Sequence, residues 1–364
     1  MKFLKSTMVA VTLSLGMVSA ASADSFTLRI GSGHPAPTPY VFGLQEYFVP
    51  TVTKRIADET DHKVRFIEAY GGKIANVFDT LEAIEKGLLD IGAYCVCFET
   101  SKLLPWNFDY FLPFTTSDVR LSNKLKSEIV ENHPELKEML GKYNQSYLPG
   151  MTGFDDYGIG TVEPWSSPEE LKGKKIVAAG PNLPWATLFG VLPVTSSLPQ
   201  MYNDMQTGVA EGTIIFPSAH GGSYKFFEVA PYWTVTGFGA MNQNMLAINN
   251  DTKAKLPQEI MDIITEEAAN YSVWANDYAY EWYEKGLKVI SEEGSKRGID
   301  NAVTELSMEG RKVWATVLKD WPNERANDII SEYGIDAAAI MNDYMDLAEK
   351  EGHVWPVRYE ISKN

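Results

Sequence analysis

Few residues in this chain have the types and spacing that enzymes use for chemistry. The five histidines are scattered, and none stands in the H-x-H or H-E-x-x-H spacing that holds zinc. Neither a G-x-S-x-G nucleophile elbow nor a G-x-x-x-x-G-K-[ST] phosphate loop occurs. We therefore expect no catalysis, no cofactor and no metal site. The alternative is a secreted enzyme of unfamiliar type.

One motif does suggest a cofactor site. The loose dinucleotide fingerprint G-x-G-x-x-A is matched by GSGHPA at residues 31–36, directly after a strand predicted at 26–30. However, Pro35, Pro37 and Pro39 prevent the helix N-terminus that would hold a pyrophosphate. The next predicted strand also ends without an acidic residue near the expected spacing of about 20 residues. We therefore reject a dinucleotide site.

The only two cysteines, Cys95 and Cys97, stand one residue apart. On a strand their side chains would share one face, and a disulfide across a single residue would be strained. We expect two buried free thiols rather than a bridge. A metal site built on these thiols lacks further ligands nearby.

One pattern of helix end, glycine and strand occurs twice. Residues 84–94 and 205–215 each contain the last turn of a helix, a glycine (Gly87 or Gly208), an acidic residue and a short apolar strand. Both glycines suit the left-handed cap that ends a helix. Predicted strands at 64–70 and 175–179 precede the two copies, and each runs into glycine. Unless the match is a coincidence, it predicts two similar α/β lobes with a ligand in the crevice at their strand ends.

The first 23 residues predict a secretory signal peptide. Lys2 and Lys5 precede an apolar stretch, and a small-residue cleavage site ends at Ala23, before Asp24. Removal of the two lysines changes the net charge from −16 to −18. Such an acidic chain is a poor nucleic-acid binder, because neutralising phosphates requires clustered Lys and Arg. No later stretch reaches about 18 apolar residues. We expect an exported, soluble, monomeric protein of the periplasm.

Hydrophobic periodicity places the remaining elements. Helices are predicted at 40–59, 76–86, 117–131, 134–142, 182–190, 198–207, 307–319, 322–333 and 336–351, and further strands at 89–97, 147–157, 211–216 and 241–248. A long helix at 257–293, ended by Gly294, would span roughly 55 Å and thus reach across two lobes. We place lobe one at 24–150 plus 241–285, and lobe two at 151–240 plus 286–364.

With these features together, the chain resembles the DctP-type substrate-binding proteins of tripartite ATP-independent periplasmic (TRAP) transporters. The resemblance covers nearly all of the mature chain. It is carried by AYGG at 69–72, GLLDI at 87–91, LPF at 112–114, SPEELKGKKI at 167–176 and FFEV at 226–229. It implies a two-lobed periplasmic binding protein fold (type II-like) of α/β class, with a long helix spanning both lobes. It also implies hinge closure over an organic solute, often a carboxylate, and delivery of that solute to a membrane permease.

The chain departs from the family where the solute's carboxylate is usually held. The strand position that usually carries the clamping Arg is Val177 here, and Tyr157 stands at a second position that is Arg in some members. Phe216 replaces a frequent Asn, and Glu99 stands about where those same members carry another cation. These departures favour a neutral, zwitterionic, amine-bearing or aromatic solute. The alternative is that Lys73 or Lys175 has taken over a carboxylate.

The candidate ligand-binding residues follow from the predicted strand ends and from the resemblance. Tyr94, Phe98 and Trp185 belong to this set because their segments end at the crevice. The full set is His34, Lys73, Tyr94, Phe98, Glu99, Tyr157, Val177, Asn182, Trp185, Phe216 and Asn242.

Overall fold

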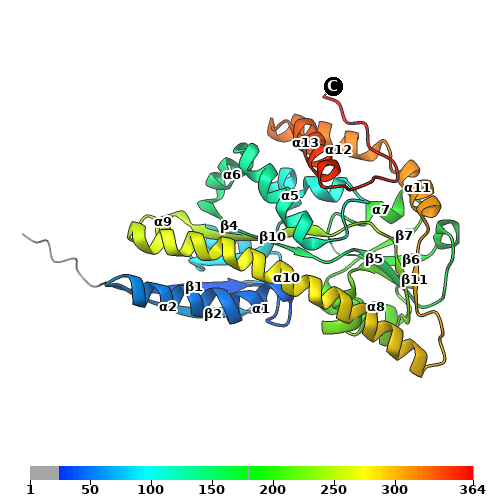
Figure 1. The fold of residues 1–364 in the computed structure, drawn as a ribbon, viewed down its shortest axis with the longest axis horizontal. Helices are drawn as coiled ribbons and strands as arrows, with labels where there is room; N and C mark the ends of the chain where they lie inside the picture. Colours follow the sequence, from blue (N-terminus) through cyan, green and yellow to red (C-terminus); the bar gives the residue numbers. More distant parts are fainter. Residues whose placement is uncertain (1–23, 179, 364) are drawn as a thin grey trace, which may run out of the picture.

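Two mixed sheets, each flanked by helices, form the two lobes of the molecule (Figure 1). This computed structural model describes residues 24–178 and 180–363, so the predicted signal peptide and Ala179 lie outside the described residues. The first sheet has the strand order β2-β1-β3-β10-β4, and the second has the order β11-β9-β5-β8-β6-β7. The prediction of an α/β fold with two lobes and a helix along both is confirmed.

The first sheet is parallel except for one strand. It contains β1 (Ser25–Ser32), β2 (Lys63–Tyr70), β3 (Ile91–Cys95), β10 (Met241–Asn249) and β4 (Gln145–Phe154). β1 pairs in parallel with β2 and with β3, whereas β10 runs antiparallel to both β3 and β4. β3 and β10 are buried along their whole length, as expected for central strands covered on both faces.

The second sheet is built from shorter strands. These are β5 (Gly158–Thr161), β6 (Lys175–Ala178), β7 (Leu192–Thr195), β8 (Gly212–Ile215), β9 (Tyr232–Val235) and β11 (Val303–Glu305). Strands β5, β7, β9 and β11 were not among the predicted elements. They are three or four residues long, too short to show an alternating pattern in the sequence.

Helices cover both faces of lobe one. They include α1 (Pro39–Gly43), η1 (Leu44–Phe48), α2 (Val49–Glu59), α3 (Thr80–Glu85), α4 (Thr100–Leu103), η3 (Leu104–Phe111), α5 (Val119–Asn132), α6 (Glu135–Glu138), η4 (Met139–Tyr143) and α9 (Asn250–Lys253). α1, η1 and α2 follow one another without a break and match the helix predicted at 40–59. By contrast, the helix predicted at 76–86 begins only at Thr80. Asp118 caps α5, since its side chain accepts a hydrogen bond from the Arg120 backbone N–H at 2.9 Å.

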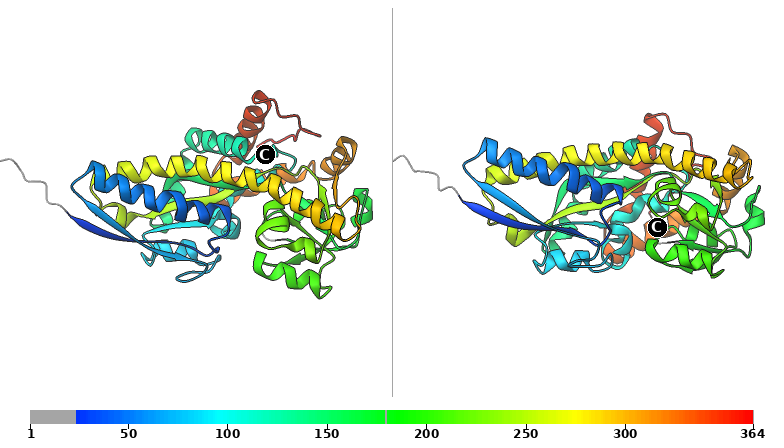
Figure 2. Two further views of the ribbon diagram at one scale, coloured as in Figure 1. Left: turned by 60° about the horizontal axis from the view of Figure 1, so that its bottom comes forward. Right: turned by 90° about the horizontal axis from the view of Figure 1, so that it is seen from below.

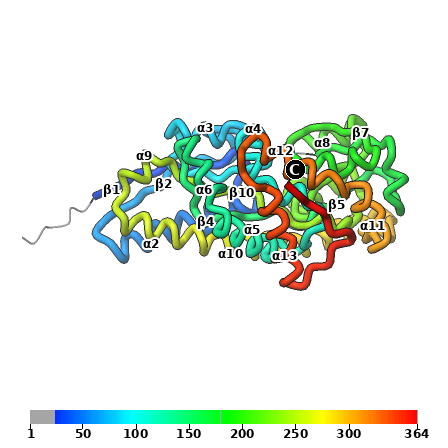
Figure 3. The backbone as a smooth tube through the Cα atoms, turned by 90° about the horizontal axis from the view of Figure 1, so that it is seen from above, coloured from blue at the N-terminus to red at the C-terminus, as the bar shows by residue number. Residues whose placement is uncertain are grey.

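Lobe two and the C-terminal region contribute the other helices. These are η5 (Pro168–Leu171), α7 (Pro184–Thr187), α8 (Leu198–Gln206), η6 (Ser218–Ser223), η7 (Phe226–Glu228), α11 (Met308–Val317), α12 (Trp321–Tyr333) and α13 (Ala337–Lys350). Figure 3 shows α12 and α13 lying over lobe one, where they contact η3 and α5. α11 instead packs against lobe two, with Trp314 donating a hydrogen bond to the Trp185 carbonyl at 2.7 Å. The predicted residue boundaries of the lobes remain a prediction.

The long helix α10 (Gln258–Lys296) runs along both lobes (Figure 2). It contacts α1, α2 and β4 on one side and η6, β9 and β11 on the other. It continues past Gly294, so the predicted stop was wrong. Gly294 is buried against Ala302, and a Cβ there would lie 2.2 Å from the Ala302 Cβ. This glycine therefore permits close packing and does not cap the helix.

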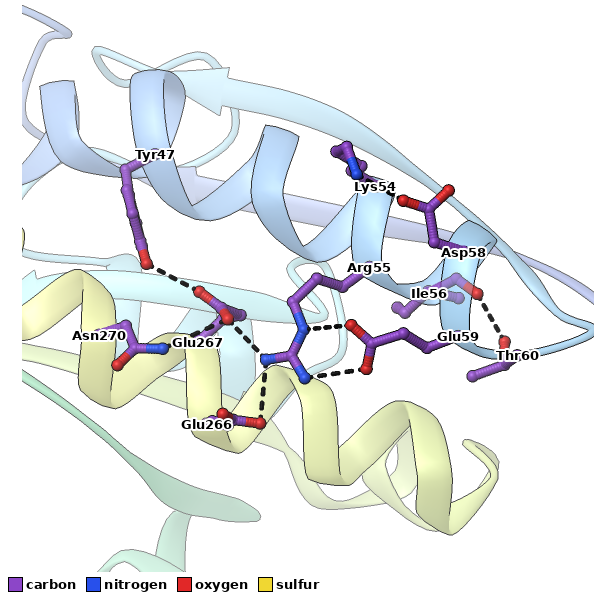
Figure 4. A network of polar contacts seen from close by, with 10 residues as sticks. All are labelled: Tyr47, Lys54, Arg55, Ile56, Asp58, Glu59, Thr60, Glu266, Glu267 and Asn270. Atoms are coloured by element: carbon purple, nitrogen blue, oxygen red, sulfur yellow. Dashed lines mark hydrogen bonds and ion pairs between the residues drawn. The ribbon is translucent and has the colours of Figure 1, made fainter.

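A charged network fastens α10 to lobe one (Figure 4). Arg55 on α2 contacts Glu59 of its own helix, and its Nη1 lies 2.9 Å from Glu266 and 2.7 Å from Glu267 on α10. Tyr47 donates a further hydrogen bond to Glu267 at 3.0 Å. The Glu267 side chain is only 4% exposed, so solvent screens its pairing with Arg55 less than it screens ordinary surface pairs.

The two cysteines form a disulfide, and the prediction of free thiols was wrong. Strand β3 ends at Cys95, and the chain then turns into the short 3₁₀ segment η2 (Val96–Phe98). The turn brings the Cα atoms of Cys95 and Cys97 to 5.0 Å, within the range that a disulfide spans. The prediction had assumed an extended strand through Cys97.

Candidate functional site

A small cavity lies between the two sheets, where strand ends from both lobes meet. β1 leads to His34, β3 leads through η2 to Phe98, and β4 ends at Phe154. From lobe two, β6 leads to Asn182 and β8 leads to Phe216. The lining residues are His34, Cys97, Phe98, Phe154, Tyr157, Asn182, Leu198, Ile214, Ile215 and Phe216. The crevice at the strand ends is where ligands bind in α/β folds.

Stacked aromatic rings form one wall of this cavity. Phe154 and Phe216 stack with their centroids 4.5 Å apart and their planes within 12°. Tyr157 meets Phe216 edge-on at 5.4 Å, and its hydroxyl pairs with the Tyr110 hydroxyl at 2.9 Å. Behind this wall, Trp185 is fully buried and donates to the Tyr110 carbonyl at 2.8 Å. The predicted Trp185 therefore supports the wall and does not line the cavity.

Two polar side chains face the cavity. Asn182 is 1% exposed, and neither its Oδ1 nor its Nδ2 has a hydrogen-bond partner. An amide buried without partners is costly, so a bound group with both a donor and an acceptor would be favoured there. His34 is also buried, and its Nδ1 pairs with the Tyr40 hydroxyl at 2.7 Å. Burial lowers the pKa of His34 to about 4, so the ring is neutral near pH 7.

No charged side chain is among the residues that line this cavity. Val177, which stands where the resemblance implies an Arg, is fully buried in β6 between Val194 and Thr213. Lys73 and Lys175 are exposed, and neither lines the cavity. Neither lysine that could have bound a carboxylate in the alternative interpretation therefore lies at the cavity.

Three other predicted residues lie outside the cavity. The Tyr94 hydroxyl donates to Gln145 at 3.1 Å inside lobe one. Glu99 pairs with Lys102 at 3.1 Å, and burial raises the pKa of its carboxyl to about 7. Asn242 donates to Asn276 on α10 at 3.3 Å. These side chains were predicted because their segments approach the crevice, but each turns into the protein instead.

A wider chamber of about 700 Å³ lies next to the cavity. Cys97 and Phe98 line both spaces. The remaining walls come from lobe one, from the lobe-two loops at 180–184 and 195–197, and from α12 through Trp321 and Arg325. The sequence interpretation missed Phe154, because it lies inside a predicted strand, and Arg325, because only the packing of α12 brings it here.

A second hollow of about 580 Å³ belongs to lobe two alone. It lies between the loop at 162–165 and helix α8, and Trp165 and Met205 are among its lining residues. Because one lobe supplies every lining residue, a change in the angle between the lobes would not enclose it. The space between the lobes is therefore the better candidate site.

Within residues 24–178 and 180–363, no group of three or more His, Cys, Asp and Glu side chains is placed to hold a metal ion. In the same part of the chain, no helix has both the length and the apolar character needed to cross a membrane.

Comparison with known proteins gives consistent matches along most of the chain. Residues 38–324 match the family model described as bacterial extracellular solute-binding protein, family 7. A C4-dicarboxylate-binding periplasmic protein, DctP, of Rhodobacter capsulatus is 23% identical over 329 residues, covering 89% of this chain and 93% of that protein.

Solved structures with the same fold come from TRAP systems. A TRAP periplasmic solute-binding protein from Desulfovibrio salexigens has a TM-score of 0.73 at 19% identity, covering 90% of this chain and 97% of that one. A marine metagenome TRAP solute-binding protein specific for pyroglutamate has a TM-score of 0.73 at 17% identity, covering 89% of this chain and 99% of that one.

Proposed function

Because the chain belongs to the bacterial extracellular solute-binding proteins of family 7, which are non-catalytic receptors of TRAP transporters, we propose that it holds a ring-bearing or otherwise largely apolar solute between its lobes. The family as a whole binds small organic solutes outside the cytoplasm. What is proposed for this chain is the class of solute and the residues that hold it.

The aromatic wall without a charged neighbour carries this proposal. Phe98, Phe154, Tyr157 and Phe216 offer ring faces and edges, and Asn182 offers an unused amide. A carboxylate placed in this inner cavity would be buried without a positive partner, which is strongly unfavourable. Hence the part of the solute that lies against this wall is uncharged or positively charged, and it is neutral, amine-bearing or aromatic.

The relative specific for pyroglutamate supports a ring-bearing solute. Pyroglutamate carries a ring amide, which has one donor and one acceptor. A group of that kind would satisfy the side-chain amide of Asn182 on both of its unpaired atoms. Cations are also compatible with the wall, since a cation over an aromatic face gains roughly 0.5 to 2 kcal/mol.

Calorimetric titration with variants of the cavity tests the proposal. Compounds that stabilise the protein against heat are first selected from neutral, zwitterionic, aromatic and dicarboxylate solutes. We expect Phe216→Ala and Asn182→Ala to weaken binding of the selected compound by about tenfold or more, since each change removes a contact with the solute. Phe189→Ala is the matched control, because Phe189 is a buried lobe-two ring that does not line the cavity. Tight binding of a plain dicarboxylate, unaffected by Phe216→Ala and lost with Lys73→Met or Lys175→Met, would overturn the proposal.

The membrane permease of a TRAP transporter is the proposed partner. We further propose that residues 1–23 direct export and are removed after Ala23, and that the mature protein works as a monomer. Solute uptake by membranes that carry the permease should require this protein. Uptake that continues without it would contradict the role as receptor.

A further inference from the structure

The outer chamber holds a positive charge that the inner cavity lacks. We infer that Arg325 receives an anionic group of the solute, so that the solute is a ring-bearing compound with one acidic group. Its apolar part then lies among the aromatic side chains, and its acidic group lies in the outer chamber. This inference rests on the proposed function and adds a residue that determines specificity.

Arg325 has an unused hydrogen-bond donor. Its Nε is buried and has no partner, whereas its Nη2 pairs with Asp328 on the next turn of α12. The Arg325 side chain is 37% exposed and that of Asp328 is 42% exposed, so the pair is of the surface kind that contributes little. A guanidinium presents its donors as a planar fork that matches a carboxylate. Nε and Nη2 form one edge of this fork, so an acid that replaces Asp328 on Nη2 would also meet the unpaired Nε.

Arg325 is also the only charged side chain among the described residues that line the outer chamber. Aromatic rings surround the space: Phe78 meets Phe98 edge-on at 5.0 Å, and Phe111 meets Trp321 edge-on at 5.5 Å. Hydroxyl groups of Thr195, Ser196 and Ser197 lie in the loop that lines it from lobe two. One cation among aromatic and hydroxyl groups fits a ring compound with a single acidic group better than it fits a dicarboxylate.

The position of Arg325 explains how the chain manages without the family's usual clamp. That clamp would stand on β6, where Val177 is buried instead. The positive charge therefore reaches the space between the lobes from α12 and not from β6.

Acids and their amides, compared on matched variants, test the inference. The probes are phenylacetate with phenylacetamide, cyclohexanecarboxylate with its amide, and pyroglutamate with its amide. Titrations use the wild type, Arg325→Gln, Arg325→Lys and Arg358→Gln. Arg358 is the control because it lies in the same C-terminal region, pairs with Asp346 and Glu349, and does not line the chamber.

In the wild type we expect at least one acid to bind about 10- to 100-fold more tightly than its amide, as for a hydrogen bond to a charged group. Arg325→Gln should remove this preference, Arg325→Lys should restore part of it, and Arg358→Gln should leave it unchanged. Added NaCl should weaken binding of the acid and leave binding of the amide nearly constant.

The titrations distinguish a failure of the role of Arg325 from a failure of the proposed function. If amides bind as tightly as acids, or if Arg325→Gln keeps the preference for acids, the inference fails. The proposed function still stands in that case, provided that Phe216→Ala weakens binding of the same probes. If no acid and no amide binds the wild type at millimolar concentration, the inference fails, and the proposed function then depends on the wider solute screen.

Discussion

At the scale of single residues, two adjacent carboxyl groups hold together the segments that pass between the lobes. Asp155 accepts hydrogen bonds from the Ser218 backbone N–H at 2.9 Å and from the Ser218 hydroxyl at 2.6 Å. Asp156 accepts from the Gly239 backbone N–H at 2.9 Å. Burial raises the pKa of both carboxyls to about 7, and the charge of Arg311 opposes the rise at Asp156 only in part.

This shift predicts how stability depends on pH. Because the pKa of Asp155 is higher in the folded chain than its usual value of about 3.9, the folded state binds more protons between about pH 4 and pH 7. The free energy of unfolding that Asp155 contributes therefore falls as the pH rises through this window. Asp155→Asn, which keeps a side-chain oxygen as acceptor, should lose less stability between pH 5 and pH 8 than the wild type.

Thermal unfolding at pH 5 and pH 8 measures this difference. Buried His34 and His220 act in the opposite sense, since burial lowers their pKa values to about 4 and about 3. The comparison is therefore made with Asp118→Asn, because Asp118 is a helix cap whose pKa is lowered. Equal pH responses in Asp155→Asn and Asp118→Asn would contradict the assignment.

The candidate site was predictable from the sequence where it depends on strand ends. His34, Phe98, Asn182 and Phe216 follow the ends of strands that show a periodic pattern, and the structure brings all four to one cavity. Tyr94 and Trp185 were placed in the right segments, but the direction of their side chains depends on packing with residues far away in the sequence. No sequence pattern near Arg325 indicates a binding role, because the packing of α12 against the lobes decides which of its side chains reach the chamber.

At the scale of elements, long periodic segments were predictable and short ones were not. Strand β5 contains two glycines and β7 contains a proline, so neither has the composition of a strand. Both are held by their neighbours in the sheet, which is a tertiary effect. The contact between α10 and η6 also could not be predicted from the sequence, because it joins two glycines, Gly286 and Gly221, that are 65 positions apart.

Replacing Gly286 should disturb this contact. A Cβ at this position would lie 2.3 Å from the Pro217 carbonyl oxygen, which is backbone and cannot rotate away. We expect Gly286→Ala to lower the free energy of unfolding by about 1 to 3 kcal/mol, although alanine itself favours a helix. Urea unfolding gives the value. Gly310→Ala in α11 is the control, since its Cβ would first meet the flexible end of Leu306; an equal loss in both variants would sink the argument.

At the scale of the whole molecule, the two lobes touch around the site. A Cβ at Gly180 of lobe two would lie 3.2 Å from the Cys97 Cβ of lobe one. The chain passes between the sheets at residues 155–157 and 236–240 and again within α10. Several connections close together at one side of a cleft are typical of proteins that open and close by a hinge.

We expect the hinge to close on binding of the solute. Small-angle scattering should show a smaller radius of gyration when the protein is saturated with the tightest-binding compound from the calorimetric screen. Phe216→Ala at the same concentration of compound should stay close to the solute-free value, because it binds less. An unchanged radius for the saturated wild type would count against closure.

The continuity of α10 also restricts how the two lobes can move relative to each other. An uninterrupted helix of 39 residues is about 58 Å long, and its length is fixed by its backbone hydrogen bonds. Because it lies along both lobes, the lobes cannot translate away from each other, and rotation is the freedom that remains. Gly286 of the helix lies in close contact with Pro217 of lobe two, so this part of the helix is expected to move with lobe two.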